Sequence, residues 1–351
     1  MKNKSNRIFR YRNYPQILAG AAAVGKTEGE GPLASSFDVL NPDDGVGCKS
    51  WEAAEAAFVT QAAEKAIEKS GVAPSGIDLS FSGDLLNQCT ASTFGLRAFS
   101  IPHAGLFGAC STFALALGMA AMAVDGGYAA HVLAVSSSHF CSAEKQFRFP
   151  LEYGGQRAQT TQRTVTGAGA CVIGQKKKQS GVFIAAGLVG KITDRGVKDA
   201  ANMGAAMAPA AKETIAAFLD ESETVPADYD MILTGDLGSV GSDLLKELLR
   251  EEDGLDISAV HRDCGNLIFD PYTQDVHAGG SGCGCSAAVV SSRILRALQR
   301  KELKRVLFVG TGALMSPVST LQGEAIPCIA HAVLLCSGTE EGEVLCGSKR
   351  S

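Results

Sequence analysis

The sequence predicts an α/β protein made of two pseudo-symmetric halves, because one strand–site–helix–strand unit occurs twice along the chain. In each copy a strand that ends in Gly-Asp-Leu, at 79–85 and 231–237, lies upstream of a cysteine, Cys110 or Cys285. A helical stretch and another apolar strand follow, and the leucine of that strand comes 23 positions after Cys110 and 22 after Cys285. Alternating strands and helices in two copies are typical of sheets that sandwich buried helices.

The chain is long enough for two halves that share a large core, since 46% of its 351 residues are hydrophobic and 20% are charged. We expect the halves at 1–178 and 179–351, because the lysine-rich turn at 176–181 is the best linker candidate. The net charge of −5 argues against nucleic acid as a partner. No apolar run reaches the roughly 18 residues that cross a bilayer, so any membrane association should go through partners.

The cysteines indicate reduced, buried thiols in a cytosol-like compartment. There are eleven, an odd number, and most lie inside apolar runs instead of in spaced pairs. Cys283 and Cys285 form an isolated Cys-x-Cys without a second pair of ligands, so we expect no metal site.

Periodicity and capping signals predict the elements of the first half in turn. Ser50 is a plausible N-cap for a helix at 51–69, whose apolar residues recur at steps of three and four and which Gly71 ends. The stretch 111–124 is apolar all round, so this helix should be buried between two sheets. The other elements expected in this half are strands at 17–24, 78–82, 101–106, 131–137 and 167–174.

The second half repeats this alternation. We expect one helix near 209–219 and another after Cys285. The strands are expected at 182–188, 231–234, 306–309 and 329–335. In the first half, between the strands at 131–137 and 167–174, residues 140–166 read as an irregular polar segment, and a loop of that length in a compact fold is usually functional.

The repeated unit, the cysteine at the start of a buried helix and the Gly-rich second copy resemble the thiolase fold, which ketoacyl synthases share. That resemblance implies two pseudo-symmetric halves in a five-layer αβαβα sandwich. More specifically, the sequence resembles the stage V sporulation protein AD family from about residue 31 to 333. The segments that carry this likeness are 83–88, 106–112, 146–150 with 152–156, 203–211 and 279–286.

The family resemblance implies a binding protein rather than a condensing enzyme. Members of this family are associated with dipicolinic acid (pyridine-2,6-dicarboxylic acid), which they bind and help to take up into the developing spore. The resemblance further implies other membrane proteins of the SpoVA system as partners, a peripheral location at the forespore or spore inner membrane, and a homodimer formed through the strand at 101–106. It implies no cofactor other than calcium carried with dipicolinate.

Cys110 takes the position of the acyl-accepting nucleophile of thiolases. A cysteine at a helix N-terminus is close to the positive end of the helix dipole, which favours the thiolate and anion binding. Gly108 and Ala109 leave room for close approach of a ligand. The alternative is a buried structural thiol, because free cysteines are among the most buried residues.

The residues that would activate Cys110 in a condensing enzyme are replaced by others at the positions where the resemblance would place them. A ketoacyl synthase histidine would fall at 234–236, where this chain reads Thr-Gly-Asp. Cys328 stands near the position of a thiolase's second cysteine, but Ala330 and His331 replace the glycines that follow it there. We therefore expect no efficient Claisen chemistry.

Several polar residues are candidates for ligand binding in the cleft near Cys110. Asp84 and Asp236 end equivalent strands, and Asn87 follows Asp84 by three positions. The alternative role of the two aspartates is to cap the turn or helix that follows each strand. His139 follows the C-terminal end of a strand, where ligands collect in α/β sheets, although a lone histidine is more often structural.

The segment 140–166 adds Arg148 and Tyr153 as candidates. Dipicolinate is a planar dianion, so its site needs a flat apolar slot and donors for both carboxylates. Arg148 lies between two phenylalanines and suits a bidentate contact beside apolar walls. Alternatively, calcium neutralises the ligand and a carboxylate helps to bind the metal.

Two other functions stay open from sequence alone. One is an active acyltransferase or condensing enzyme that uses Cys110 with an unanticipated base such as His139 or His331. The other is a scaffold that recruits membrane partners and binds no small molecule.

Overall fold

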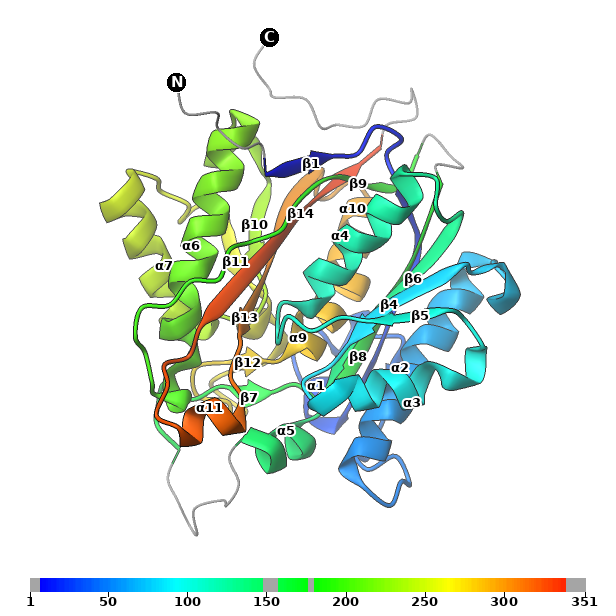
Figure 1. The fold of residues 1–351 in the computed structure, drawn as a ribbon, viewed down its shortest axis with the longest axis horizontal. Coiled ribbons are helices and arrows are strands. Elements are labelled where there is room, and N and C mark those ends of the chain that lie inside the picture. Colours follow the sequence, from blue (N-terminus) through cyan, green and yellow to red (C-terminus); the bar gives the residue numbers. More distant parts are fainter. Residues whose placement is uncertain (1–6, 148–156, 176–179, 339–351) are drawn as a thin grey trace.

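The computed structural model describes residues 7–147, 157–175 and 180–338, which form a mixed α/β structure with two similar sets of strands (Figure 1). The first set consists of β2 (Gln16–Val24), β4 (Leu79–Gly83), β5 (His103–Gly105), β6 (His131–Ser138) and β8 (Gly167–Gly174). The second set consists of β9 (Val182–Leu188), β10 (Met231–Thr234), β11 (His261–Asp263), β13 (Arg305–Ala313) and β14 (Cys328–Ser337). Their orders in space are β2-β8-β6-β4-β5 and β9-β14-β13-β10-β11.

Strand directions repeat between the two sets, which confirms the predicted pseudo-symmetric α/β class. Along each order the first two pairs are antiparallel and the last two are parallel. The sets meet where β2 pairs antiparallel with β9, with Gln16 opposite Phe183 and Ile17 opposite Val182. The division after residue 178 stays a prediction, because residues 176–179 lie outside the described part of the chain.

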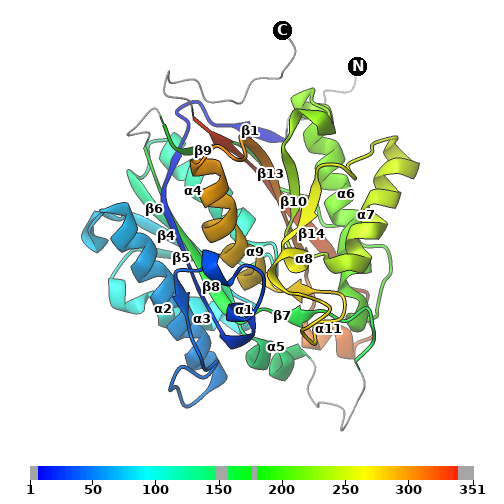
Figure 2. The ribbon, with the colours of Figure 1, turned by 180° about the vertical axis from the view of Figure 1, so that it is seen from behind.

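The helices form three layers that alternate with the strands (Figures 1 and 2). The middle layer consists of α4 (Thr112–Asp125) and α9 (Cys283–Val289), which pack against strands of the first set, and α4 also packs against β13 and β14. The outer layers are α2 (Trp51–Ser70) with α3 (Thr90–Leu96) on one side and α6 (Met203–Ser222) with α7 (Gly238–Asp253) on the other. This is the expected αβαβα sandwich.

The helix predicted at 51–69 is confirmed as α2, together with both of its caps. The Ser50 Oγ accepts a hydrogen bond from the Ala53 N–H at 3.2 Å, and Gly71 ends the helix with φ of 68°. A left-handed residue at that position favours glycine, because other residues would bring Cβ against the backbone. The alanines and Phe58 of its apolar stripe are buried against the first strand set.

The helix predicted at 111–124 is confirmed as α4, shifted by one residue. Its side chains enter the large central core cluster, and Phe113 packs against Phe308 of β13 with ring centroids 6.4 Å apart. The absence of a polar face therefore did indicate a helix enclosed by strands on both sides.

Two segments differ from the predictions. The start of the supposedly irregular stretch 140–166 is a helix, α5 (Phe140–Phe147), because its residues Ser142 and Ala143 pack inward and Ser142 hydrogen-bonds to Glu55 of α2 at 2.6 Å. The helix expected near 209–219 is the longer α6, which begins at Met203 behind an Asn202 N-cap and contains Pro209 in its interior.

The remaining elements are short and lie around these layers. They are β1 (Ile8–Arg10), α1 (Lys26–Gly29), β3 (Val39–Leu40), β7 (Arg163–Thr164), α8 (Cys264–Ile268), β12 (Gly280–Ser281), α10 (Leu295–Gln299) and α11 (Pro317–Leu321). A π-helical turn at Val290–Ile294 joins α9 to α10.

Candidate functional site

Cys110 lies in a tight turn that leads into α4, and its side chain is nearly enclosed, with 6% exposed. Three hydrogen bonds close the turn: the Ser111 Oγ donates to the Gly108 carbonyl at 2.6 Å, the Thr112 Oγ1 donates to the Ala109 carbonyl at 2.6 Å, and the Gly108 N–H donates to the Thr112 Oγ1 at 3.0 Å. Ala109 adopts φ of 49°, a left-handed conformation that costs energy for a residue with a Cβ. Several hydrogen bonds therefore hold this strained turn in place, and the turn thereby fixes the position of the thiol.

Asp236 lies beside Cys110 and joins it to the second half of the protein. The Thr311 Oγ1 donates to the Asp236 Oδ1 at 2.7 Å, and the Gly282 N–H donates to its Oδ2 at 2.8 Å. The Cys110 thiol lies against this carboxyl group, and each of the two groups shifts the pKa of the other. Burial is the main cause that raises the pKa of Asp236 from 3.8 to about 7.

The position of Cys110 at a helix start predicted a stabilised thiolate, and this prediction is wrong. Burial raises the pKa of the Cys110 thiol well above its usual value, and the nearby Asp236 raises it further. The helix dipole acts over the first turn only, and it does not outweigh desolvation and a neighbouring carboxylate here. Cys110 is therefore held as a neutral thiol.

An apolar pocket opens above this cluster. Its walls come from the loop before α4, from α5, from α6 and from the segment after β13. Its polar lining residues are Glu144, Thr164 and Ser281, and Cys110 and Gly282 lie beside them. The apolar lining side chains include Leu85, Phe107, Phe147, Met203 and Met315. The free volume is about 40 Å³, which admits a few water molecules but no aromatic ring.

Gly282 is required at the floor of this pocket. Its φ is 97°, and a Cβ there would lie 2.6 Å from the Ser138 Oγ. Only glycine allows the backbone to approach β6 this closely while its N–H faces Asp236. The Gly-rich segment noticed in the sequence thus brings the second half against the first.

The two predicted aspartates have different surroundings. Asp236 contacts Cys110 directly, whereas Asp84 accepts hydrogen bonds from the Leu86 N–H at 2.9 Å and from the N–H and Oγ of Ser92 at 2.8 and 2.7 Å. Asp84 is fully buried, and desolvation raises its pKa. Its contacts close the turn after β4, which matches the capping alternative.

Asn87 borders a separate cavity, of about 370 Å³, on the other side of α5. Its N–H donates to the Gln146 Oε1 at 3.3 Å, and Gln146 donates to the Leu85 carbonyl at 2.9 Å. Lys145 lines the same cavity and pairs with Glu52 at 2.6 Å. Helix α5 therefore separates this polar cavity from the apolar pocket beside Cys110.

His139 is fully buried, and both of its ring nitrogens contact the backbone. Nε2 lies 2.9 Å from the Asp44 carbonyl, and Nδ1 accepts from the Cys141 N–H at 3.1 Å. The ring packs against Trp51, with centroids 5.4 Å apart. Burial lowers the pKa of His139, so the neutral imidazole is favoured. His139 is not among the residues that line the pocket in the described part of the chain.

The other two predicted ligand residues, Arg148 and Tyr153, lie outside the described residues.

Glu55 is a buried acid of this region that the sequence analysis did not single out. It accepts hydrogen bonds from the Ser137 Oγ at 3.0 Å and the Ser142 Oγ at 2.6 Å. Burial and, next, the nearby Asp84 raise its pKa to about 8. The sequence does contain a signal for this buried acid, because Glu55 falls four residues after Trp51, on the otherwise apolar stripe of α2.

The described residues contain no cluster of three or more His, Cys, Asp and Glu side chains arranged to hold a metal ion. Within the same part of the chain, no helix is both long enough and apolar enough to cross a membrane.

The comparisons with known proteins agree on fold and family. Among solved structures, 3-oxoacyl-[acyl-carrier-protein] synthase III from Aquifex aeolicus VF5 superposes with a TM-score of 0.56 at 14% identity, covering 92% of this chain and 99% of that chain. An OleA variant from Xanthomonas campestris superposes with a TM-score of 0.57 at 13% identity, covering 93% and 99%. The layers, the repeated strand order and the cysteine at the head of α4 define a protein with a thiolase-like fold.

The sequence comparisons narrow this class to one family. A family model described as Stage V sporulation protein AD (SpoVAD) matches residues 5–336. The chain is also 46% identical over 318 residues to Stage V sporulation protein AD of Bacillus subtilis (strain 168), covering 91% of this chain and 93% of that protein. The chain belongs to the stage V sporulation protein AD family.

Proposed function

We propose that this protein binds dipicolinic acid, or its calcium chelate, in the pocket beside Cys110 and acts in dipicolinate uptake into the developing spore. The family supports a role in sporulation. The observation that carries the proposal is an apolar pocket whose lining includes the thiol of Cys110 and the backbone of Gly282, with the carboxyl group of Asp236 buried behind them. A flat aromatic diacid needs this combination of apolar walls and a polar end.

The pocket must widen to admit the ligand. Its free volume of about 40 Å³ is far below the roughly 300 Å³ at the lower end of small-molecule sites. Met203 and Met315 line it, and methionine side chains change rotamer readily. Displacement of α5 would join the pocket to the polar cavity that holds Asn87 and Lys145, which would supply amide and cationic donors.

The charge of Asp236 decides which form of dipicolinate the pocket accepts. Asp236 is fully buried behind the lining residues Cys110 and Gly282. Its ionised carboxylate repels the dianion through these residues, whereas the protonated carboxyl group does not. Because the pKa of Asp236 is about 7, affinity for free dipicolinate should be nearly constant below that pH and fall by up to about tenfold per unit above it. The calcium chelate is neutral, so its affinity should change much less.

Isothermal titration calorimetry tests the proposal, with dipicolinate and with calcium dipicolinate at about pH 6 and about pH 8.5. We expect one saturable site per chain and a lower affinity for the free dianion at the higher pH. Cys110→Ala should weaken binding, whereas Cys48→Ala, at an exposed thiol remote from the pocket, should not. Absence of saturable heat with both ligand forms would refute the proposal.

A second candidate function is acyl transfer through Cys110, favoured by the condensing enzymes among the structural neighbours. Against it, the pKa of the thiol is raised, and both nitrogens of His139 contact the backbone. His331 accepts from the Gly190 N–H through Nδ1 at 3.2 Å, and burial lowers its pKa to about 4. We therefore propose a non-catalytic role. A stable acyl adduct on Cys110 after incubation with acyl-CoA, detected by mass spectrometry, would favour the enzyme instead.

We further propose that the protein works as a peripheral homodimer at the forespore or spore inner membrane, together with membrane proteins of the SpoVA system. The edge strand β5 supports the dimer, because Phe94 and Phe107 near it leave about half of their surface exposed. Sedimentation of Phe107→Ser as a monomer, under conditions in which the parent sediments as a dimer, would support this geometry. A parent protein that is monomeric at all concentrations would contradict it.

A further inference from the structure

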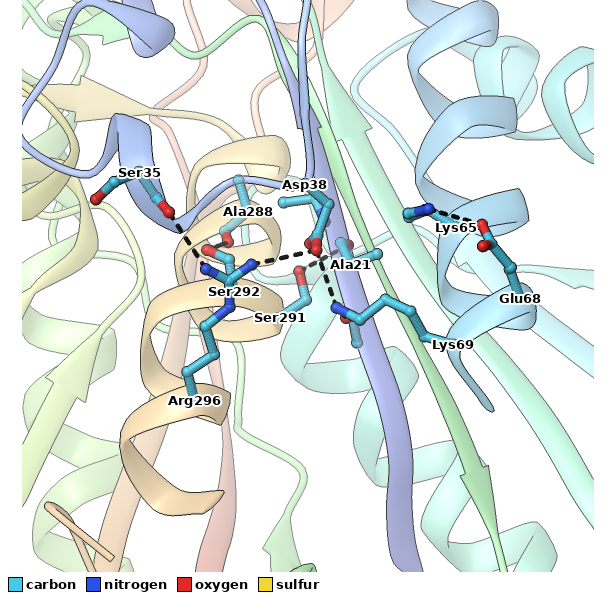
Figure 3. Close-up of polar contacts among 12 residues, drawn as sticks. Ala21, Ser35, Asp38, Lys65, Glu68, Lys69, Ala288, Ser291, Ser292 and Arg296 are labelled. Atoms are coloured by element: carbon cyan, nitrogen blue, oxygen red, sulfur yellow. Dashed lines mark hydrogen bonds and ion pairs between the residues drawn. The ribbon is translucent and has the colours of Figure 1, made fainter. Parts of the chain in front are cut away.

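A second cavity, of about 430 Å³, lies between the two halves and shares no lining residue with the pocket beside Cys110. Its walls come from α2 of the first half and from α10 of the second, and β2 forms its floor (Figure 3). In both ribbon views α10 lies far from α5, which lines the Cys110 pocket (Figures 1 and 2).

The side chains of this cavity carry an excess of positive charge. Among the described residues that line it, Lys69, Arg296 and Arg300 contribute three cations and Asp38 one acid, which leaves a surplus of two positive charges. Asp38 is held in place by the Ala22 N–H, which donates to its Oδ2 at 3.0 Å, and only 9% of its side chain is exposed. The acid therefore orients the cations and does not neutralise them all.

The cations are oriented but retain donors. The Lys69 Nζ donates to the Asp38 Oδ1 at 3.0 Å and to the Gly20 carbonyl, which uses two of its three N–H groups. Arg296 donates to the Asp38 Oδ1 at 3.2 Å and to the Ser35 carbonyl at 3.3 Å, which uses two of its five N–H groups. The ion pair of Arg300 is with Glu302, at 3.7 Å, outside the cavity lining.

The floor of the cavity is a close contact between β2 and the π-helical turn. A Cβ on Gly20 would lie 2.6 Å from the Leu295 Cδ2 and 2.7 Å from the Ser291 carbonyl oxygen. The Ser291 Oγ donates to the carbonyls of Ala21, at 3.0 Å, and Ala287, at 2.5 Å, which satisfies backbone groups at the turn. π-Helical turns of this kind occur frequently at functional sites.

We propose that this cavity is a second binding site, for a small organic anion that carries a phosphate or carboxylate group. Its volume falls within the roughly 300–1,000 Å³ of small-molecule sites. Arg296 keeps three N–H groups for anionic oxygens beyond its bonds to Ser35 and Asp38, and Lys69 adds a point charge beside it. Since α2 and α10 belong to different halves, the bound anion would also link the halves and stabilise the folded protein.

Calorimetric titration with inorganic phosphate and with malonate, each at ionic strength matched with sodium chloride, tests the proposal. We expect saturable binding of at least one probe, and the probe that binds shows whether the site takes a phosphate or a carboxylate group. Arg296→Gln and Arg300→Gln should each weaken binding, the former by at least about tenfold. Arg250→Gln, at an exposed arginine of α7, makes the same charge change elsewhere and should leave binding unchanged.

Arg300→Gln keeps the test independent of folding, because the fixed pair of Asp38 with Arg296 stays intact in that variant. Absence of saturable binding of both probes, or equal weakening in Arg250→Gln, would overturn the proposal. Loss of dipicolinate binding in Arg296→Gln would overturn the assignment of two separate sites. If Arg296→Gln still binds dipicolinate but no longer binds phosphate or malonate, the assignment of two separate sites is supported.

Discussion

The replacement Asp236→Asn should remove a large part of the pH dependence of stability. In the folded protein the pKa of Asp236 is about 7, against an ordinary value of 3.8, chiefly because of burial. Between these two values the folded chain holds a proton that the unfolded chain has lost. The unfolding free energy from this group is therefore greatest below about pH 4 and falls as the pH rises toward 7.

The magnitude follows from the size of the pKa difference. A difference of roughly three pH units corresponds to about 4 kcal/mol over the whole range, or about 1.4 kcal/mol per pH unit. Glu28, Glu55 and Asp263 have pKa values raised to about 7, 8 and 6, so they contribute with the same sign and remain in the variant. The unfolding free energy of the variant should therefore still fall as the pH rises, but its slope should lack the contribution of one proton.

Urea unfolding followed by circular dichroism at several values between about pH 5 and pH 7 measures this slope. The asparagine amide also faces the N–H of Gly282 and the hydroxyl of Thr311, so the variant should be less stable by about 1–3 kcal/mol at about pH 5, and this deficit should shrink as the pH rises. The slope, not the absolute stability, is therefore the readout. Asp243→Asn, at an exposed aspartate of α7, is the matched control and should keep the parental slope.

Equal slopes in the parent and in Asp236→Asn would refute the reasoning, because Asp236 would then already be ionised in the folded protein at these pH values. A reduced slope in the Asp243→Asn control would refute it as well, since the effect would then follow from net charge and not from burial.

Three further predictions concern Gly282, Ser50 and Cys110. Gly282→Ala should lower the unfolding free energy by about 1–3 kcal/mol more than Gly71→Ala does. Both residues have positive φ, but only the Cβ at 282 would clash with a neighbour. Equal losses in the two variants would contradict this. Ser50→Ala should cost about 1 kcal/mol through loss of the α2 cap, measured by urea unfolding; an unchanged midpoint would contradict it. Iodoacetamide should modify exposed Cys48 well before buried Cys110 by mass spectrometry, whereas prior modification of Cys110 would indicate an accessible thiolate.

The sequence predicted those features that depend on local pattern. The helix at 51–69 with its Ser50 cap and the apolar helix after Cys110 could be predicted because periodicity and capping act within a few residues. The repeat of a strand, a site and a helix predicted the two strand sets, since each copy folds by the same local rules.

Other features depended on contacts between distant segments. α5 has a polar, irregular-looking sequence, and its Ser142 finds a partner in Glu55, 87 residues away. The pKa of Cys110 is set by burial and by Asp236 more strongly than by its place at a helix start, so the local pattern suggested the wrong direction.

Local patterns predicted the α/β class, the order of most strands and helices, and Cys110 and Asp236 as candidates for one site. They could do so because Asp236 follows the end of one strand and Cys110 follows another, and strand ends of this kind meet at one edge. Three features became visible in the folded chain alone: Asp84 closes a turn, backbone groups hold His139, and a cationic cavity lies between the halves. The physical reason is that burial, pKa and pocket shape are set by side chains that converge from both halves of the chain, and no local pattern encodes that convergence.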